Sequence, residues 1–155
     1  MKFVADSMVG KLAKWLRFLG IDVVYVQSGN LEEIVKIAQN EGRIILTRNT
    51  DVIKKLKGHR VWIYFLPTEK SEFQLKDVVE KFNLWQEIRP FSRCTVCNKP
   101  LVPVSKEDVR GKVPFYVFQN VDHFEKCPGC GRIYWKGTHV ERLRKKLSKI
   151  LGREV

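Results

Sequence analysis

The sequence predicts an α/β fold: a mainly parallel β-sheet covered by helices on both faces, followed by a small cysteine-containing module and a final helix. Three observations support this prediction. Short apolar runs alternate with amphipathic helical patterns over the first 90 residues. These runs are nearly continuous, which is typical of strands buried on both faces of a sheet. Four cysteines follow in two CxxC pairs, and with 155 residues the chain is long enough to bury a real hydrophobic core.

Two strand–helix units open the alternation. Residues 2–5 are an apolar run suited to a buried strand, and a helical pattern follows until Gly20. Residues 22–26 (DVVYV) predict the second strand. A capping-box-like pattern at Asn30 predicts the start of the next helix, and Gly42 ends it. The apolar face of the first helix is formed by Leu12, Trp15, Leu16 and Leu19.

Two further units complete the alternation. Residues 43–47 (RIILT) predict a third buried strand, and residues 52–57 predict a short helix after it. Residues 61–66 (VWIYFL) predict a fourth strand, and residues 71–82 predict the last amphipathic helix of this part. A βαβαβαβα order implies a mainly parallel sheet, in which ligands bind at the carboxyl ends of the strands.

A domain junction is predicted near Pro90, because the segment around it lacks clear periodicity. We therefore expect one domain over residues 1–90 and a second over residues 91–155. The net charge of +12 is divided unevenly between them. Residues 1–90 carry 15 basic and 11 acidic side chains (+4), and residues 91–155 carry 14 and 6 (+8). A positive excess of this size indicates a polyanionic partner, such as nucleic acid or an anionic membrane surface.

Neither a membrane span nor an export signal is visible in the sequence. No apolar run approaches the roughly 20 residues that a membrane-spanning helix needs. The N-terminus lacks the basic start, apolar core and small-residue cleavage site of a signal peptide. We therefore expect a cytoplasmic protein with no membrane partner. In that reducing compartment, cysteines are better interpreted as metal ligands than as disulfides.

Acidic and amide side chains follow the first and third strands. Asp6 comes directly after the first strand, and Asn49-x-Asp51 follows the third. If these strands are neighbours, the side chains meet at one crevice, where they would hold Mg²⁺ or Mn²⁺ and lower the pKa of an attacking water. Glu33 is a candidate supplement, whereas Asp22 begins a strand at the opposite end, where we expect a structural role. Alternatively, Asp6 and Asp51 only cap the helices after them, and Glu33 only satisfies backbone groups at its own helix start.

Four basic side chains lie near this expected crevice. Lys11, Lys14 and Arg17 are spaced i, i+3 and i+6 on the first helix, opposite its apolar face. Arg48 lies between the third strand and Asn49. We expect these residues to contact phosphate oxygens if the crevice acts on nucleic acid. The alternatives are a solvated helix face for the first three and an ion pair with a neighbouring carboxylate for Arg48.

The two CxxC pairs predict a structural zinc site. Cys94 and Cys97 are separated from Cys127 and Cys130 by 29 residues, and four thiolates complete the tetrahedral shell of Zn²⁺. Because no ligand is missing, we expect no catalysis at this metal. We expect strands of a zinc ribbon in the intervening runs, including residues 112–119 (KVPFYVFQ). A redox dithiol or a disulfide is the alternative.

Two groups of residues after position 90 allow two interpretations each. The aromatic residues of the cysteine module either stack on nucleic-acid bases or form the core of the small module. The final helix, from residue 138, has an apolar face that should pack. Its basic residues either follow a phosphate backbone or solubilise the terminus. These residues are Arg142, Arg144, Lys145, Lys146 and Lys149.

Four stretches of the chain resemble a known family. They are MKFVADSMVGKLAKWLRFLGIDVVY at the N-terminus, RIILTRNTD in the centre, and FSRCTVCNKPL and CPGCGRIYWKGTH around the cysteines. The chain resembles, over nearly its whole length, the PIN-like ribonuclease domains fused to a C-terminal zinc ribbon. This family is found at the C-terminus of the nematode silencing exonuclease and as stand-alone prokaryotic proteins.

The resemblance implies a PIN-like fold and metal-dependent cleavage of RNA, with Asp6 matching the family's acid after the first strand. Members usually have Asp where this sequence has Asn49, which offers a carbonyl oxygen but no charge. Metal affinity should therefore fall unless Asp51 or Glu33 compensates. We expect a Mg²⁺- or Mn²⁺-dependent endoribonuclease. The alternatives are an RNA-binding module with a degenerate nuclease site, acting in RNA processing or ribosome assembly, and a protein-interaction role for the ribbon.

Overall fold

A parallel four-stranded sheet forms the centre of the computed structural model, which describes all 155 residues. Its strands are β1 (Lys2–Ala5), β2 (Asp22–Tyr25), β3 (Ile44–Thr47) and β4 (Trp62–Phe65). They lie in the order β2-β1-β3-β4, and all pairs are parallel. The predicted strands are therefore confirmed. The first and third are direct neighbours, which is the condition for a shared crevice.

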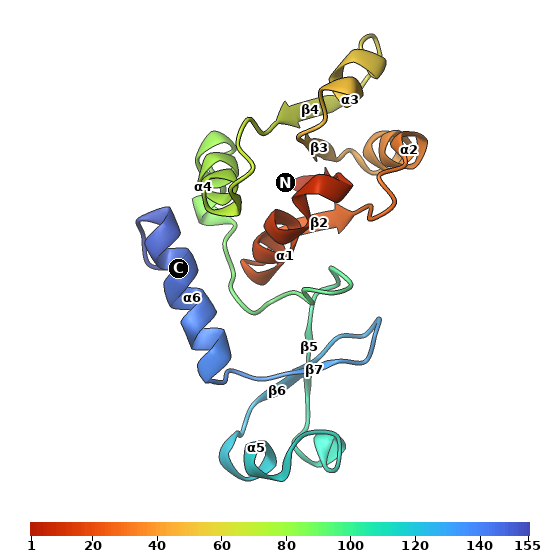
Figure 1. Cartoon of the computed structure of the whole chain (residues 1–155). Helices are drawn as coiled ribbons and strands as arrows, with labels where there is room; N and C mark the ends of the chain where they lie inside the picture. Colours follow the sequence, from red (N-terminus) through yellow and green to blue (C-terminus); the bar gives the residue numbers. More distant parts are fainter.

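Helices cover both faces of this sheet (Figure 1). On one face, side chains of β1 such as Phe3 pack against α1 (Gly10–Phe18) and α4 (Ser71–Lys81) in a core of 20 buried residues. On the other face, a smaller core of seven residues joins the sheet to α2 (Leu31–Glu41) and α3 (Thr50–Lys55). Successive residues of β1 point to opposite faces, so each apolar run contributes to both cores. The predicted α/β class is confirmed.

The part of the chain after residue 90 contains a small antiparallel sheet. Its strands are β5 (Val102–Val104), β6 (Phe124–Lys126) and β7 (Ile133–Tyr134), in sequential order. Two short 3₁₀ helices lie nearby in the chain. One, η2 (Leu84–Gln86), precedes the sheet, and the other, η3 (Glu107–Val109), is in the connection between β5 and β6.

The expectation of a ribbon strand within residues 112–119 is wrong. Phe115–Asn120 form a short helix, α5, whose residues are not buried. Pro114 precedes it with φ −55°, and its carbonyl accepts the first helical hydrogen bond, from the amide of Phe118. A short apolar run does not distinguish helix from strand by its period.

The final helix, α6 (Thr138–Leu151), returns to the first core. Leu147 and Leu151 are buried in the same cluster as α1 and α4, and α6 lies beside α4 in Figure 1. The expected apolar face of this helix is thus confirmed. The domain boundary after Pro90 stays a prediction. The last helix, although it follows this boundary, packs on residues of the first part of the chain.

None of the helices combines the length and the apolar character that crossing a membrane requires.

Candidate functional site

Asp6 joins the carboxyl ends of two neighbouring strands. It follows β1, and its side chain is only 3% exposed. Thr47, at the end of β3, donates a hydrogen bond of 2.8 Å from Oγ1 to Oδ2 of Asp6. The same Oγ1 accepts a bond of 3.0 Å from the backbone N–H of Asn49. Sequence reasoning missed Thr47. The available signal was its position as the one polar side chain ending the apolar run of β3.

The second oxygen of the Asp6 carboxylate also accepts hydrogen bonds, but none of them comes from a cationic side chain. Oδ1 of Asp6 accepts from the backbone N–H of Ser7 at 2.5 Å and from its Oγ at 3.1 Å, so Asp6 also caps η1 (Ser7–Val9). None of the ion pairs of the protein includes Asp6. A carboxylate this buried normally has a cationic partner. Asp6 is thus both the N-cap of η1 and a buried carboxyl group with no cationic side chain paired to it.

The connection between β2 and α2 closes over Asp6. Gly29 has φ +67°, and a Cβ there would lie 2.8 Å from Oγ of Ser7 and 3.6 Å from Oδ1 of Asp6. Next to it, Ser28 Oγ is 3.4 Å from Oε2 of Glu33. Glu33 is exposed, and its backbone N–H is capped by Asn30 as predicted. The loop therefore holds Glu33 near the crevice without placing it in contact with Asp6.

On the other side, Asn49 and Asp51 begin α3. Asn49 is the cap of this helix, because its Oδ1 accepts from the backbone N–H of Asp51 at 2.9 Å. Asp51 therefore is not the cap, and its exposed side chain lies in the first turn. The carboxylates of Asp6, Glu33 and Asp51 do not form a group with ligand atoms within 4.8 Å of one another. The structure brings Asp6, Thr47 and Asn49 together and leaves the other two acids exposed.

Of the predicted phosphate-binding residues, Lys11 and Lys14 are exposed on α1 as expected. Arg48 is half-buried and donates from Nη1 to the carbonyl of Leu66 at 2.8 Å, so it joins the ends of β3 and β4. It forms no ion pair with a carboxylate, contrary to the alternative.

Arg17 does not share this exposed stripe. It is 8% exposed, and a spacing of three residues drifts by about 60° per step on a helix of 3.6 residues per turn. Its Nε donates to the carbonyl of Val23 at 2.8 Å, and its Nη1 to the carbonyls of Thr95 and Val96 at 3.1 and 3.0 Å. Burial lowers the pKa of this guanidinium, while the thiols of Cys94 and Cys97 act in the opposite direction.

The four cysteine sulfurs form the second candidate centre. All four Sγ atoms lie within 4.8 Å of one another, and none forms a disulfide. Cys94 and Cys130 are separated by 3.8 Å, and Cys97 and Cys127 by 3.7 Å. A tetrahedral zinc centre with Zn–S bonds of about 2.3 Å has sulfur–sulfur edges of about 3.8 Å. The donor set and its spacing therefore fit Zn²⁺.

The surroundings of Cys94 and Cys130 favour thiolates, the form that binds metal, whereas those of Cys97 do not. Burial tends to raise the pKa of Cys94, but hydrogen bonds from Tyr134 and from backbone N–H groups outweigh it, so the net pKa is lowered. Hydrogen bonds from Arg132 lower the pKa of Cys130 to about 6. The hydrogen bond to Cys130 and burial raise the pKa of Cys97 to about 12. Full ionisation of the set thus calls for a bound cation.

The first cysteine loop docks on the outer side of β2. Asn98, with φ 71°, accepts from the backbone N–H of Val23 at 3.0 Å and donates from Nδ2 to Asp22 at 2.6 Å. Together with Arg17, it satisfies both backbone groups of Val23 on the free edge of the sheet. Asp22 also accepts from Arg43 at 2.7 Å, so its structural role is confirmed.

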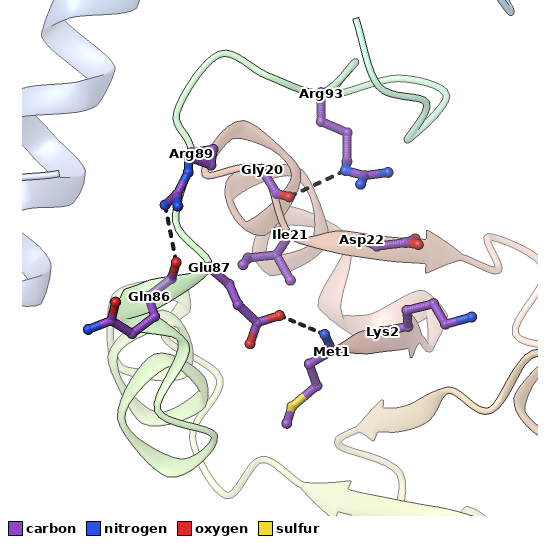
Figure 2. Close-up of a pocket in the computed structure, with 9 residues that line it drawn as sticks. All are labelled: Met1, Lys2, Gly20, Ile21, Asp22, Gln86, Glu87, Arg89 and Arg93. Atoms are coloured by element: carbon purple, nitrogen blue, oxygen red, sulfur yellow. Dashed lines mark hydrogen bonds and ion pairs between the residues drawn. The ribbon is translucent and has the colours of Figure 1, made fainter.

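A pocket of ≈ 390 Å³ lies at the other end of the sheet, where β1 and β2 begin (Figure 2). Two of the charged groups that line it are held by contacts within the chain. The amino group of Met1 is 2.6 Å from Oε1 of Glu87, and Arg93 donates to the carbonyl of Gly20 at 3.4 Å. Figure 2 shows both contacts along its wall. None of the candidate catalytic residues lines this pocket.

Comparison with known proteins gives one match. The model of the family described as the Mut7-C RNAse domain matches residues 1–147. The matched range includes the four-stranded sheet, the end of β1 with Asp6, and all four cysteines. No curated protein and no solved structure matches the chain.

Proposed function

The chain belongs to the Mut7-C RNAse domain family, and on that premise we propose that it is a metal-dependent endoribonuclease acting at the carboxyl edge of the four-stranded sheet. The main observation in support of this proposal is the environment of the Asp6 side chain. Its carboxylate is 3% exposed, accepts three hydrogen bonds and has no cationic partner. A bound divalent cation would supply the missing charge.

The residues around Asp6 fit Mg²⁺ or Mn²⁺, which prefer oxygen ligands. Asp6 would hold the ion, with the side-chain oxygen of Asn49 and the exposed carboxylates of Asp51 and Glu33 as further ligands. Such an ion, when bound, polarises a phosphoryl oxygen and lowers the pKa of a water molecule.

The chain's own residues then bind and orient the substrate. Thr47 and Ser7 fix the plane of the Asp6 carboxylate through hydrogen bonds to its two oxygens. The exposed ammonium groups of Lys11 and Lys14 bind phosphate oxygens beside the crevice. The Asp51 carboxylate is exposed, so it would be accessible to the ion and to the water that attacks phosphorus.

The cysteine centre has a structural role in this proposal. Four thiolates leave no open position on zinc for a substrate or a water molecule. The centre holds the loop that carries Asn98 against β2. Free thiols suit a reducing compartment, and we place the protein in the cytoplasm.

Cleavage of a labelled single-stranded RNA tests the proposal, with Mg²⁺, with Mn²⁺ and with EDTA. The variants are Asp6→Asn and Asp51→Asn, with Asp108→Asn as the control, because Asp108 is exposed on η3 within the cysteine module. We expect Asp6→Asn to lower the rate by about 100-fold or more, which is roughly 2.7 kcal/mol of lost transition-state stabilisation. Asp108→Asn should keep the wild-type rate. Cleavage by Asp6→Asn at the wild-type rate would contradict the proposed site.

One observation favours a second candidate function, that of an RNA-binding module with a degenerate nuclease site, acting in RNA processing or ribosome assembly. Asn49 carries no charge, and the three acids are not gathered within 4.8 Å. The same experiment separates the two functions. RNA binding that weakens with salt, without cleavage at any metal concentration, would support the second.

A further inference from the structure

We propose that α6 binds the phosphodiester backbone of RNA through a stripe of four cations, and that Lys11 connects this stripe to the crevice at Asp6. We define the α6 stripe as Arg142, Lys145, Lys146 and Lys149. The inference rests on the proposed action on RNA and adds the path that the substrate takes across the molecule.

The stripe is a single exposed face of the helix. At 100° per residue, its four members fall within about 100° of arc. All four are exposed, and none lies within 4.0 Å of a carboxylate. The acids near this helix are held elsewhere: Arg144 contacts Glu141 at 3.0 Å and Glu154 at 3.7 Å. No member of the stripe is therefore neutralised by a direct ion pair.

Repulsion within the stripe opposes formation of the helix. Members of the stripe are three or four residues apart, the spacings at which like charges on a helix repel each other. The exposed faces of α2 and α4 mix acids with lysines instead, as with Glu33 and Lys36 on α2. The helix forms because Leu147 and Leu151 are buried against the first core. A bound polyanion would relieve the repulsion among these charges.

Trp15 links the stripe to the first helix. The Nζ of Lys11 lies 4.9 Å from the centroid of this indole ring, and the Nζ of Lys146 lies 5.4 Å from the same centroid. The two ammonium groups are therefore at most about 10 Å apart, although they lie far apart in the sequence. Lys11 lies in the first turn of α1, five residues after Asp6. Lys11 and Lys146 thus form a row of cations across Trp15, between the start of α1 and α6.

The chemistry of this row selects the backbone of RNA rather than its bases. Ammonium groups are point charges that bind phosphate, and the indole beneath them is only 4% exposed, so it offers no surface on which a base could stack. A membrane surface fits poorly, because the apolar face of α6 is already buried in the core.

The test is binding of a 5′-fluorescein-labelled 20-nucleotide oligouridine, measured by anisotropy over a range of salt concentrations in EDTA, where cleavage cannot interfere. The stripe variant is Lys145→Gln/Lys149→Gln, whose residues are away from Trp15. The matched control is Lys36→Gln/Lys76→Gln, which removes the same charge from exposed positions of α2 and α4. Circular dichroism verifies that all variants keep their helices.

We expect the stripe variant to lower the slope of log Kobs against log salt by about 1.4, since each lost phosphate contact of a single strand removes about 0.7. At 0.1 M salt, this corresponds to affinity weaker by roughly 25-fold. The control should keep the wild-type slope. Equal losses in both variants, or an unchanged slope in the stripe variant, would overturn the proposal. So would loss of binding to phosphatidylserine vesicles with unchanged RNA binding.

This outcome is separate from that of the cleavage assay. Stripe-dependent binding by a protein that never cleaves RNA would remove the proposed nuclease function and keep the role of α6. Cleavage that depends on Asp6, together with unchanged RNA affinity in the stripe variant, would keep the nuclease function and remove the role of α6.

Discussion

Thr47 and Asp6 are joined by a 2.8 Å hydrogen bond between side chains at the ends of two neighbouring parallel strands. The threonine hydroxyl also accepts from the backbone of Asn49, so one side chain fixes the acid and the start of α3 together. A hydroxyl that donates to a carboxylate restricts its rotation, and a positioned ligand oxygen binds metal better than a mobile one.

Replacing Thr47 should therefore impair the crevice without unfolding the protein. We expect Thr47→Val to lower the cleavage rate by about 10- to 100-fold and to raise the Mn²⁺ concentration needed for half-maximal rate. Thr47→Ser keeps the hydroxyl and should restore most of the activity. The measurement is the rate over a Mn²⁺ titration. Equal rates and equal Mn²⁺ dependence for the Val variant and wild type would show that the hydrogen bond has no such role.

Arg17 makes three hydrogen bonds to backbone carbonyls of β2 and the first cysteine loop, and replacing it should destabilise the fold. Arg17→Met leaves these three carbonyls without their donor, and that of Val23 is buried, so we expect a total cost of about 3 kcal/mol in the free energy of unfolding. Lys14→Met, on the exposed side of the same helix, should change it by no more than about 0.5 kcal/mol. Urea denaturation at neutral pH measures both. Similar values for the two variants would argue against a structural role for Arg17.

Metal removal should loosen the outer side of β2. The protein is expected to carry about one zinc per chain, and a chelator should release it. The amide of Val23, which donates to Asn98 of the cysteine loop, should then exchange with solvent faster. The amide of Val26 donates to Ala5 inside the sheet and serves as the internal control. Hydrogen exchange followed by NMR gives both rates, and unchanged protection of Val23 in zinc-free protein would contradict this coupling.

The lowered pKa of Asp22 predicts that the stability of the protein depends on pH. Burial tends to raise its pKa, but hydrogen bonds from Arg43 and Asn98 outweigh burial, and the net pKa lies below 3.8. Because the folded state favours the ionised form, this stabilisation is complete above the unfolded pKa and is lost as the pH falls through the folded pKa. We expect Asp22→Asn to cost about 2 kcal/mol at pH 7.

That cost should shrink as the pH falls below the unfolded pKa of about 3.9, because the unfolded chain then binds a proton that the folded protein still excludes. Urea unfolding of wild type and Asp22→Asn at pH 7 and at pH 3 measures the difference. A difference between the two proteins that stays constant over this range would show that Asp22 does not titrate as proposed.

The sequence predicted local features of the fold well. Each strand of the parallel sheet contains an apolar run of at least three residues, and the helix caps are encoded nearby, as with Asn30 at the start of α2. The cysteine set was predicted because CxxC spacing places two sulfurs on one turn. The α5 helix was missed, since its short aromatic run has no period that separates helix from strand.

Long-range contacts were the part that sequence could not supply. Thr47 and Asp6 are 41 residues apart, and Asn98 and Asp22 are 76 residues apart. Neither pair leaves a periodic mark, because the strand order that joins them depends on the packing of the whole chain. The burial of Arg17 has the same origin, since its partners Thr95 and Val96 come from the cysteine loop.

The docking of Asn98 on Val23 also bears on how the protein behaves at high concentration. An uncovered outer strand is a template on which other molecules add strands, and this is a common start of aggregation. The cysteine loop blocks that addition at β2. Oxidation of the thiols or loss of zinc is therefore expected to produce self-association through this strand before the sheet unfolds, so turbidity would precede loss of helical signal.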